Sequence, residues 1–330
     1  MIPGHEHFPV PALRPKWLAL SATWNCNARC TLCDLWKTKE RTMLEVEPLM
    51  DAVNQPWFDC IENVAFFGGE PTLNPQIVEL YGAVRNRFPW AVVSIVTWGG
   101  MELARKRLEE MARINPQLWV CVSLDGDKET HDERRGKVGA YEEVMETLAL
   151  CKSLFKPRLR LSWTATGASA GQVRHVAQMA RKFDADVSMR PAADGQYFNT
   201  IEGDRAPTWT AEQIDDLESA ISEIPNEDLA MPGFAKAMPE FLRTGEHIDC
   251  QAPVHAIVCD PDLQARVCHG RPPLGHLKDY PDIYAQHPEW WEAMEGECFR
   301  ASCFIDGPYS IGYAFKRGFS GTFSRLPVVA

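Results

Sequence analysis

The 330-residue sequence lacks the features that mark secreted, membrane and nucleic-acid-binding proteins. It has no basic excess, because 34 Lys and Arg stand against 45 Asp and Glu, and the net charge of −11 disfavours a general nucleic-acid binder. The first residues, MIPGHEHFPVPALRPKW, combine neither a basic lead nor an apolar core, so we predict no signal peptide. No uninterrupted apolar run approaches about 20 residues. We therefore predict a cytoplasmic protein with no membrane partner and no nucleic-acid partner.

Cysteine, in contrast, is abundant. The chain has 11 cysteines, and in a reducing cytoplasm such a number indicates metal binding rather than disulfides. Three of them, Cys60, Cys121 and Cys151, are scattered, and we interpret them as small hydrophobic residues. The others form one group near each end of the chain: Cys26, Cys30 and Cys33, then Cys250, Cys259, Cys268, Cys298 and Cys303.

Short apolar runs alternate with amphipathic segments up to residue 191. The runs cover 17–23, 63–69, 91–97, 118–126, 158–166 and 185–191, and the helix-like segments between them include 74–88, 101–113, 141–155 and 171–183. This alternation predicts a parallel sheet with helices outside. A Gly-rich dinucleotide fingerprint is absent, and the alternation stops short of the ~250 residues of a complete eight-unit barrel. We predict an α/β fold, a partial (β/α)6 TIM-like barrel.

The pattern changes after residue 191. A linker or lid is followed by helices predicted at 210–223 and 233–243, and then by two short β-like runs around a turn at DPDLQ, residues 260–264. We predict that residues 1–194 form the barrel. Residues 195–330 are predicted to form a small C-terminal cysteine-rich α+β domain.

The stretch WNCNARCTLCDLW, residues 24–36, contains three cysteines separated by three and two residues. A structural zinc site needs four ligands, and no fourth ligand lies near Cys33. Three thiolates suit three corners of a 4Fe–4S cluster and leave the fourth iron open. The loop directly follows the first predicted strand, so it lies at the carboxyl edge of the sheet, where functional loops gather. Zinc remains the alternative.

Three further motifs stand at or after the ends of predicted strands. They are GGEP at 68–71, SLDG at 123–126 and HDERRG at 131–136. Together with the cysteines they resemble the radical S-adenosylmethionine (SAM) superfamily over residues 17–191. Two positions depart from that family. Trp98 stands where members usually carry the asparagine of TNG, and Leu32 stands where an aromatic residue is often found; Trp98 is interpreted either as local packing or as a pocket wall.

The resemblance implies a catalytic 4Fe–4S cluster on Cys26, Cys30 and Cys33, with SAM chelating the open iron. It implies that GGEP binds the methionine amino group, Ser123 the ribose region and Arg135 the methionine carboxylate. The full set of implied SAM contacts is Leu32, Gly68, Gly69, Glu70, Pro71, Thr97, Ser123, Asp125 and Arg135. One electron, from a donor such as flavodoxin or ferredoxin, then cleaves SAM to methionine and a 5′-deoxyadenosyl radical, which takes hydrogen from a C–H bond.

The C-terminal cysteines resemble the twitch appendage, a short form of the SPASM extension. That resemblance implies an auxiliary 4Fe–4S cluster on Cys250, Cys268, Cys298 and Cys303, with structural zinc as the alternative. Leu263 stands near the place of the family's hairpin glycine. Cys259 lies in the apolar run AIVC, so we interpret it as hairpin core rather than as a ligand.

Substrate-handling residues are predicted at the end of the sixth strand, where MRPAADGQY contains Arg190, Asp194 and Tyr197. The length, without a long leader-binding extension before the first strand, favours a small polar substrate such as a sugar, aminocyclitol or nucleoside. A fully ligated auxiliary cluster favours net oxidation, because it suits electron transfer. The alternatives are redox-neutral decarboxylation or rearrangement, a peptide-modifying maturase and, more remotely, a non-catalytic iron–sulfur electron-transfer protein.

Overall fold

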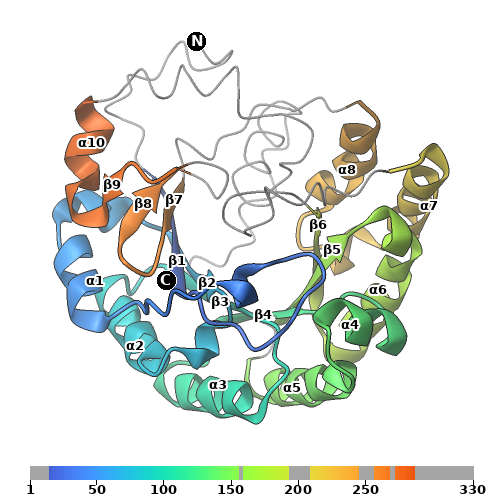
Figure 1. The fold of residues 1–330 in the computed structure, drawn as a ribbon, viewed down its shortest axis with the longest axis horizontal. Helices are drawn as coiled ribbons and strands as arrows, with labels where there is room; N and C mark the ends of the chain where they lie inside the picture. Colours follow the sequence, from blue (N-terminus) through green and yellow to red (C-terminus); the bar gives the residue numbers. More distant parts are fainter. Residues whose placement is uncertain (1–14, 156–158, 193–208, 245–255, 268–271, 287–330) are drawn as a thin grey trace.

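A computed structural model describes residues 15–155, 159–192, 209–244, 256–267 and 272–286, and all structural statements refer to these ranges. Within them, helices surround the outer side of a curved sheet (Figure 1). None of the helices in these ranges is long and apolar enough to cross a membrane.

Six parallel strands form the main sheet, in the spatial order β6-β5-β4-β3-β2-β1. Each begins within one residue of its predicted start, because the apolar runs that mark buried parallel strands are short and well separated. The strands are β1 Trp17–Thr23, β2 Asn63–Gly68, β3 Val92–Thr97, β4 Trp119–Ser123, β5 Leu159–Ala165 and β6 Asp186–Pro191. The sheet does not close on itself, so the predicted partial TIM-like barrel is confirmed.

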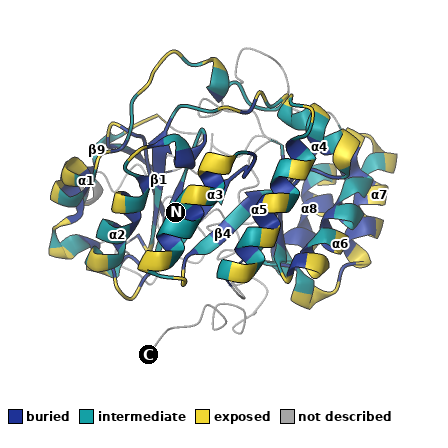
Figure 2. Cartoon of the chain, turned by 90° about the horizontal axis from the view of Figure 1, so that it is seen from below, coloured by how far each residue is buried: buried dark blue, intermediate teal, exposed yellow. Residues whose placement is uncertain are grey.

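The connecting helices cover one face of this sheet and have their exposed residues on the side away from it (Figure 2). In α6, for example, the buried positions Val173, Val176, Ala177, Ala180 and Phe183 follow the three- and four-residue spacing of one helix face. The predicted helices appear as α2 Ile77–Arg87, α3 Glu102–Ile114, α5 Ala140–Leu154 and α6 Val173–Phe183. Two shorter helices, α1 Val46–Val53 and α4 Lys128–Arg135, were not among those predicted.

The described part of the C-terminal region lies at both edges of the barrel sheet. Helices α7 Ala211–Ser222 and α8 Pro232–Thr244 pack beside β6 and α6, as Figure 1 shows. At the other edge, β7 Ala256–Cys259 pairs in parallel with β1. Strands β8 Gln264–Arg266 and β9 Gly275–His276 extend the sheet further, and α10 Tyr280–Gln286 follows. The division at residue 194 stays a prediction.

The predicted turn at DPDLQ joins β7 to β8. Asp260 N–H donates to the Gln264 carbonyl at 2.9 Å, and Leu263 N–H donates to the Asp260 carbonyl at 2.9 Å. Leu263 has a φ of 65°, the left-handed conformation that a three-residue hairpin loop needs at its last position. Its side chain is nevertheless buried, with 3% exposure. The leucine therefore occupies a backbone conformation that glycine adopts without strain.

The cysteines outside the terminal groups differ in their burial. Cys151 in α5 is fully buried in the core, whereas Cys60 and Cys121 are partly buried. Cys259 is also fully buried, opposite Leu20 of β1, as expected for hairpin core. None of the described cysteines forms a disulfide.

Candidate functional site

The segment 24–34, here called the cysteine loop, begins directly after β1 at the carboxyl edge of the sheet. Its three cysteines are partly buried. Burial raises the pKa of the Cys26 thiol to about 12, and the negative charge of Glu70 adds to the effect. Burial also raises the pKa of Cys33 to about 11. Three thiols in one loop are donors that can bind iron or zinc once the metal displaces their protons.

No group of three His, Cys, Asp or Glu side chains within the described ranges is arranged to hold a single metal ion. A zinc ion needs such an arrangement, because all its ligands bind one centre. A 4Fe–4S cluster instead places each thiolate on its own iron.

The two glycines of GGEP let the end of β2 touch the cysteine loop. Gly69 N–H donates to the Thr23 carbonyl at 2.8 Å, and Glu70 N–H donates to the Asn25 carbonyl at 2.7 Å. A Cβ atom on Gly69 would lie 2.2 Å from the Asn25 carbonyl oxygen, and Gly68 has a φ of 130°. Only glycine permits this backbone approach, so part of the motif is explained by the shape of the loop.

The C-terminal end of α4 holds the other side of the loop. Arg29 N–H donates to the Arg135 carbonyl and Thr31 N–H donates to the Arg134 carbonyl, both at 3.0 Å. These carbonyls belong to the last turn of α4. Carbonyl groups in the last turn of a helix have no hydrogen-bond donor within the helix. Gly136 ends the helix with a φ of 62°, and a Cβ there would lie 2.5 Å from the Arg29 carbonyl oxygen. The HDERRG segment is therefore a second support of the cysteine loop.

Glu70 joins the ends of β2 and β3. Its fully buried carboxylate accepts hydrogen bonds from the Thr72 backbone at 3.1 Å and from the Thr97 hydroxyl at 2.8 Å. It also accepts from the Thr72 hydroxyl at 2.5 Å and from the Trp98 backbone at 3.0 Å. Burial raises the pKa of Glu70, while these donors oppose the rise. In this arrangement Glu70 and Thr97 bind each other and neighbouring protein groups, and these contacts fix the shape of the sheet edge.

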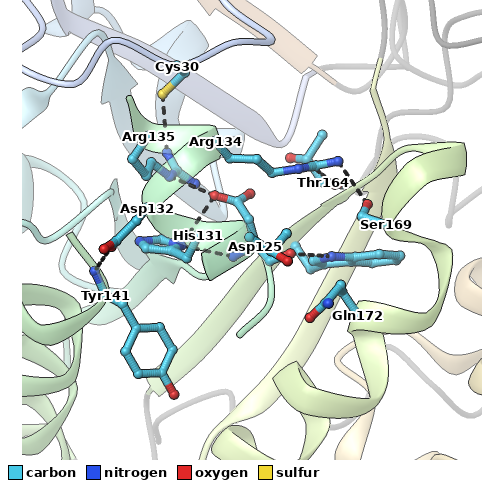
Figure 3. Close-up of polar contacts among 12 residues, drawn as sticks. Cys30, Asp125, His131, Asp132, Arg134, Arg135, Tyr141, Thr164, Ser169 and Gln172 are labelled. Carbon is cyan, nitrogen blue, oxygen red and sulfur yellow. Dashed lines mark hydrogen bonds and ion pairs between the residues drawn. The ribbon is translucent and has the colours of Figure 1, made fainter. Parts of the chain in front are cut away.

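Arg135 connects the fourth strand end to the cysteine loop, as Figure 3 shows. Its Nε donates to Asp125 Oδ2 at 2.7 Å, and its Nη1 lies 3.7 Å from Cys30 Sγ. Burial alone would raise the pKa of Asp125, but Arg135 and His131 outweigh it and hold that pKa well below its usual range. The result is a buried ion pair that brings a fixed positive charge to the cysteine loop.

Three other polar residues of HDERRG contact the elements around the cysteine loop. His131 is fully buried; its Nδ1 accepts from the Asp125 backbone at 3.1 Å, and burial lowers its pKa. Asp132 accepts from the backbone of Gly139 and Tyr141, both at 2.8 Å, and so holds the start of α5. Arg134 donates to the Thr164 carbonyl at 2.7 Å, which ties α4 to β5 (Figure 3).

The motifs and their geometry agree with comparisons to known proteins. The sequence model described as Radical SAM superfamily matches residues 20–179. The chain carries a radical SAM domain. The matched residues include the cysteine loop, GGEP, SLDG and HDERRG.

Solved structures share the fold of this chain beyond the matched domain. SuiB of Streptococcus suis, bound to its precursor peptide SuiA, aligns over 86% of this chain and 67% of its own, with a TM-score of 0.65 and 14% identity. The structure of anSMEcpe with AdoMet and the Cp18Cys peptide aligns over 92% and 97%, with a TM-score of 0.63 and 18% identity. At these identities the likeness shows the fold alone.

One curated protein is similar in sequence. The Fe-coproporphyrin III synthase of Methanosarcina barkeri is 30% identical over 138 residues, which is 39% of this chain. The aligned part covers a third, 33%, of that protein.

The other residues predicted for the radical SAM site fall into two groups. Leu32 lies in the cysteine loop, Pro71 follows Glu70, Ser123 ends β4 and Arg190 lies near the end of β6, so all four are at the carboxyl edge of the sheet. The second group lies outside the described residues: Asp194, Tyr197, Cys250, Cys268, Cys298 and Cys303. All of their roles stay predictions.

Sequence reasoning missed two residues that shape the site. Asn74 donates from Nδ2 to the carbonyls of Ala22 and Leu44, both at 2.8 Å, and so fixes the chain on either side of the cysteine loop. Asn27 accepts from the Trp98 indole at 2.8 Å. The sequence signal for Trp98 was its departure from TNG; nothing marked its partner.

Proposed function

We propose that this radical SAM protein cleaves SAM reductively at the cysteine loop and uses the resulting radical to take hydrogen from a small polar substrate. The observation that carries the proposal is the meeting of the three-cysteine loop with GGEP, SLDG and HDERRG at one edge of the sheet. A non-catalytic iron–sulfur protein has no need of Arg135 beside Cys30 or of the buried Asp125 that holds it.

In this proposal each group has a defined task. Cys26, Cys30 and Cys33 bind three irons of a 4Fe–4S cluster, and the bound cluster and SAM supply the hydrogen-abstracting chemistry. Asp125 engages Arg135 through Nε, so the outer nitrogens of the guanidinium are directed toward the cysteine loop. A guanidinium held in this way suits a carboxylate, because its fork forms two parallel hydrogen bonds. The methionine carboxylate of SAM is the group we assign to it.

The proposed overall reaction is an oxidation. One electron enters from flavodoxin, ferredoxin or a similar donor, and one hydrogen atom leaves the substrate carbon and ends in 5′-deoxyadenosine. An auxiliary 4Fe–4S cluster, for which we propose Cys250, Cys268, Cys298 and Cys303 as ligands, would supply the acceptor for the substrate radical's electron, and a base would take its proton. The product is two hydrogens lighter than the substrate. Arg190, Asp194 and Tyr197 are the proposed substrate contacts.

A second candidate is modification of a peptide. Two solved structures that hold peptides, SuiB and anSMEcpe, align over 86% and 92% of this chain, which extends past its radical SAM domain. Redox-neutral decarboxylation or rearrangement of a small substrate is the alternative to oxidation.

Anaerobic reconstitution followed by incubation with SAM and dithionite tests the central step. We expect about eight irons per chain from two four-iron clusters, and formation of 5′-deoxyadenosine. Replacing Cys26, Cys30 and Cys33 with alanine should leave about four irons and abolish SAM cleavage. Full iron content or continued cleavage in this triple variant would contradict the proposal. Deuterium transfer from labelled sugars, aminocyclitols, nucleosides or peptides into 5′-deoxyadenosine then identifies the substrate class.

A further inference from the structure

Trp98 lies directly after β3, at the place where the radical SAM family usually has an asparagine. We infer that Trp98 is a positioning residue for the cysteine loop and that it acts through Asn27; this inference rests on the proposed function. In this role Trp98 acts indirectly and binds neither the irons nor the substrate. It fixes the chain segment between Cys26 and Cys30.

The contact that carries the inference crosses from the sheet to the loop. The indole Nε1–H of Trp98 donates to Asn27 Oδ1 at 2.8 Å. Asn27 directly follows Cys26 and is exposed, whereas the Trp98 side chain is buried with 4% exposure. A buried, rigid ring therefore holds an exposed residue of the gap between the first two cysteines.

The ring itself is fixed from several directions. Its six-membered part lies on Gly100, where a Cβ atom would come within 1.5 Å of it. The Lys137 ammonium lies 5.4 Å from the ring centroid and is held by Glu143 at 2.7 Å. The backbone N–H of Trp98 donates to Glu70 Oε2 at 3.0 Å. Since both the backbone and the ring are constrained by these contacts, the direction of the Nε1–H bond is fixed independently of Asn27.

The position of Asn27 gives this bond its consequence. On one side of it, Asn25 is held by Glu70 N–H at 2.7 Å, and on the other side Arg29 is held by the Arg135 carbonyl at 3.0 Å. The Trp98–Asn27 bond lies between these two points, next to a second contact in which Asn27 Nδ2 donates to the Met101 sulfur at 3.4 Å. Because Asn27 adjoins Cys26, loss of the bond changes the orientation and surroundings of that thiolate, and hydrogen bonding and exposure around the sulfurs set cluster properties.

The test uses the full chain, reconstituted anaerobically, and compares three single variants with a double variant. Trp98→Phe keeps a ring over Gly100 and removes the donor; Asn27→Ala removes the acceptor; Asn27→Asp keeps an acceptor. We measure the rate of iron loss to a chelator, the midpoint potential of the SAM-responsive cluster and its EPR spectrum with and without SAM.

We expect Trp98→Phe and Asn27→Ala each to speed iron loss roughly fivefold, the size of one net hydrogen bond, and to shift the EPR spectrum and midpoint potential. The double variant should match Asn27→Ala, because the Trp98 donor has no acceptor left once Asn27 is replaced; Asn27→Ala also removes the contact to Met101. Asn27→Asp should restore the wild-type rate of iron loss. Unchanged spectra and rates in both single variants, or additive effects in the double variant, would overturn the inference. A wild-type chain that takes up no iron on its cysteine loop would instead overturn the proposed function.

Discussion

The ends of β1–β4 and the hairpin β7–β8 lie in the same sheet, and each contains a buried Asp–Arg pair. Asp125 and Arg135 form the first pair, and Asp260 and Arg266 the second. Their pKa shifts differ in sign. Arg135 and His131 overcome the burial of Asp125 and lower its pKa, whereas burial raises the pKa of Asp260 despite Arg266, with Asp262 and Glu40 adding to the rise.

The two regions also differ at their constrained backbone positions. Glycine occupies each close approach around the cysteine loop, at 68, 69 and 136. In the hairpin a buried leucine, Leu263, holds the left-handed position. Burial alone therefore does not determine whether an aspartate is more or less acidic than usual, or which residue type occupies a constrained backbone position. The neighbouring groups determine both.

The largest expected change in stability follows from replacing each of the two buried aspartates with asparagine. Asp125→Asn leaves Arg135 buried without its counter-charge and should cost about 4 kcal/mol of unfolding free energy at pH 7. Asp260→Asn also leaves Arg266 without its counter-charge, but it removes a carboxylate whose pKa is raised by burial, so we expect a smaller loss than for Asp125→Asn. Urea unfolding of the cluster-free protein at a series of pH values measures both.

The contribution of each aspartate, measured as the stability of the wild type minus that of the variant, should change with pH in opposite directions. Asp125 has a lowered pKa when folded, so its stabilisation is present above the unfolded value of about 3.9 and is lost as pH falls below it. Asp260 has a raised pKa, so its carboxylate destabilises the fold as pH rises through and above that value. If the two stability differences between wild type and variant changed with pH in the same direction, the opposite signs of the pKa shifts would be contradicted.

The second prediction concerns the glycine that touches the cysteine loop. Gly69→Ala places a Cβ atom 2.2 Å from the Asn25 carbonyl oxygen, so the loop must move, and we expect a loss of about 3 kcal/mol. Gly82→Ala is the matched control. A Cβ on Gly82, inside α2, meets only Ile114 Cδ1 at 3.8 Å, so this variant should gain about 0.5–1 kcal/mol. Equal stability of the two variants by urea unfolding would show that the backbone contact is not required.

The smallest expected effect separates strain from burial at Leu263. Leu263→Ala loses the buried side chain and keeps the left-handed conformation, whereas Leu263→Gly loses the same side chain and relieves the strain. Both variants should be less stable than the wild type, with the glycine variant about 1 kcal/mol more stable than the alanine variant. Thermal and urea unfolding measure the difference. An alanine variant as stable as the glycine variant would mean that the leucine conformation carries no strain.

Local patterns were sufficient for much of the fold and part of the site. Each barrel strand is a short apolar run, and the cysteine loop could be placed at the carboxyl edge because it directly follows the first run. The pairing of β7 with β1 could not be predicted, because no local pattern links Leu20 to Cys259. The dual use of HDERRG was hidden for a similar reason, since its support of the loop runs through the backbone carbonyls of residues 134 and 135.

The position of β1 between β2 and β7 has a consequence for synthesis on the ribosome. β1 meets β2 early, but Leu20 pairs with Cys259, which is 239 residues later in the chain (259 − 20). Chain synthesis proceeds at roughly 5–20 residues per second, so one edge of β1 stays unpaired for about 10 to 50 seconds. Such an open edge is a template for misassociation between nascent chains. This interior strand of the finished sheet is thus an edge strand until β7 has been synthesised.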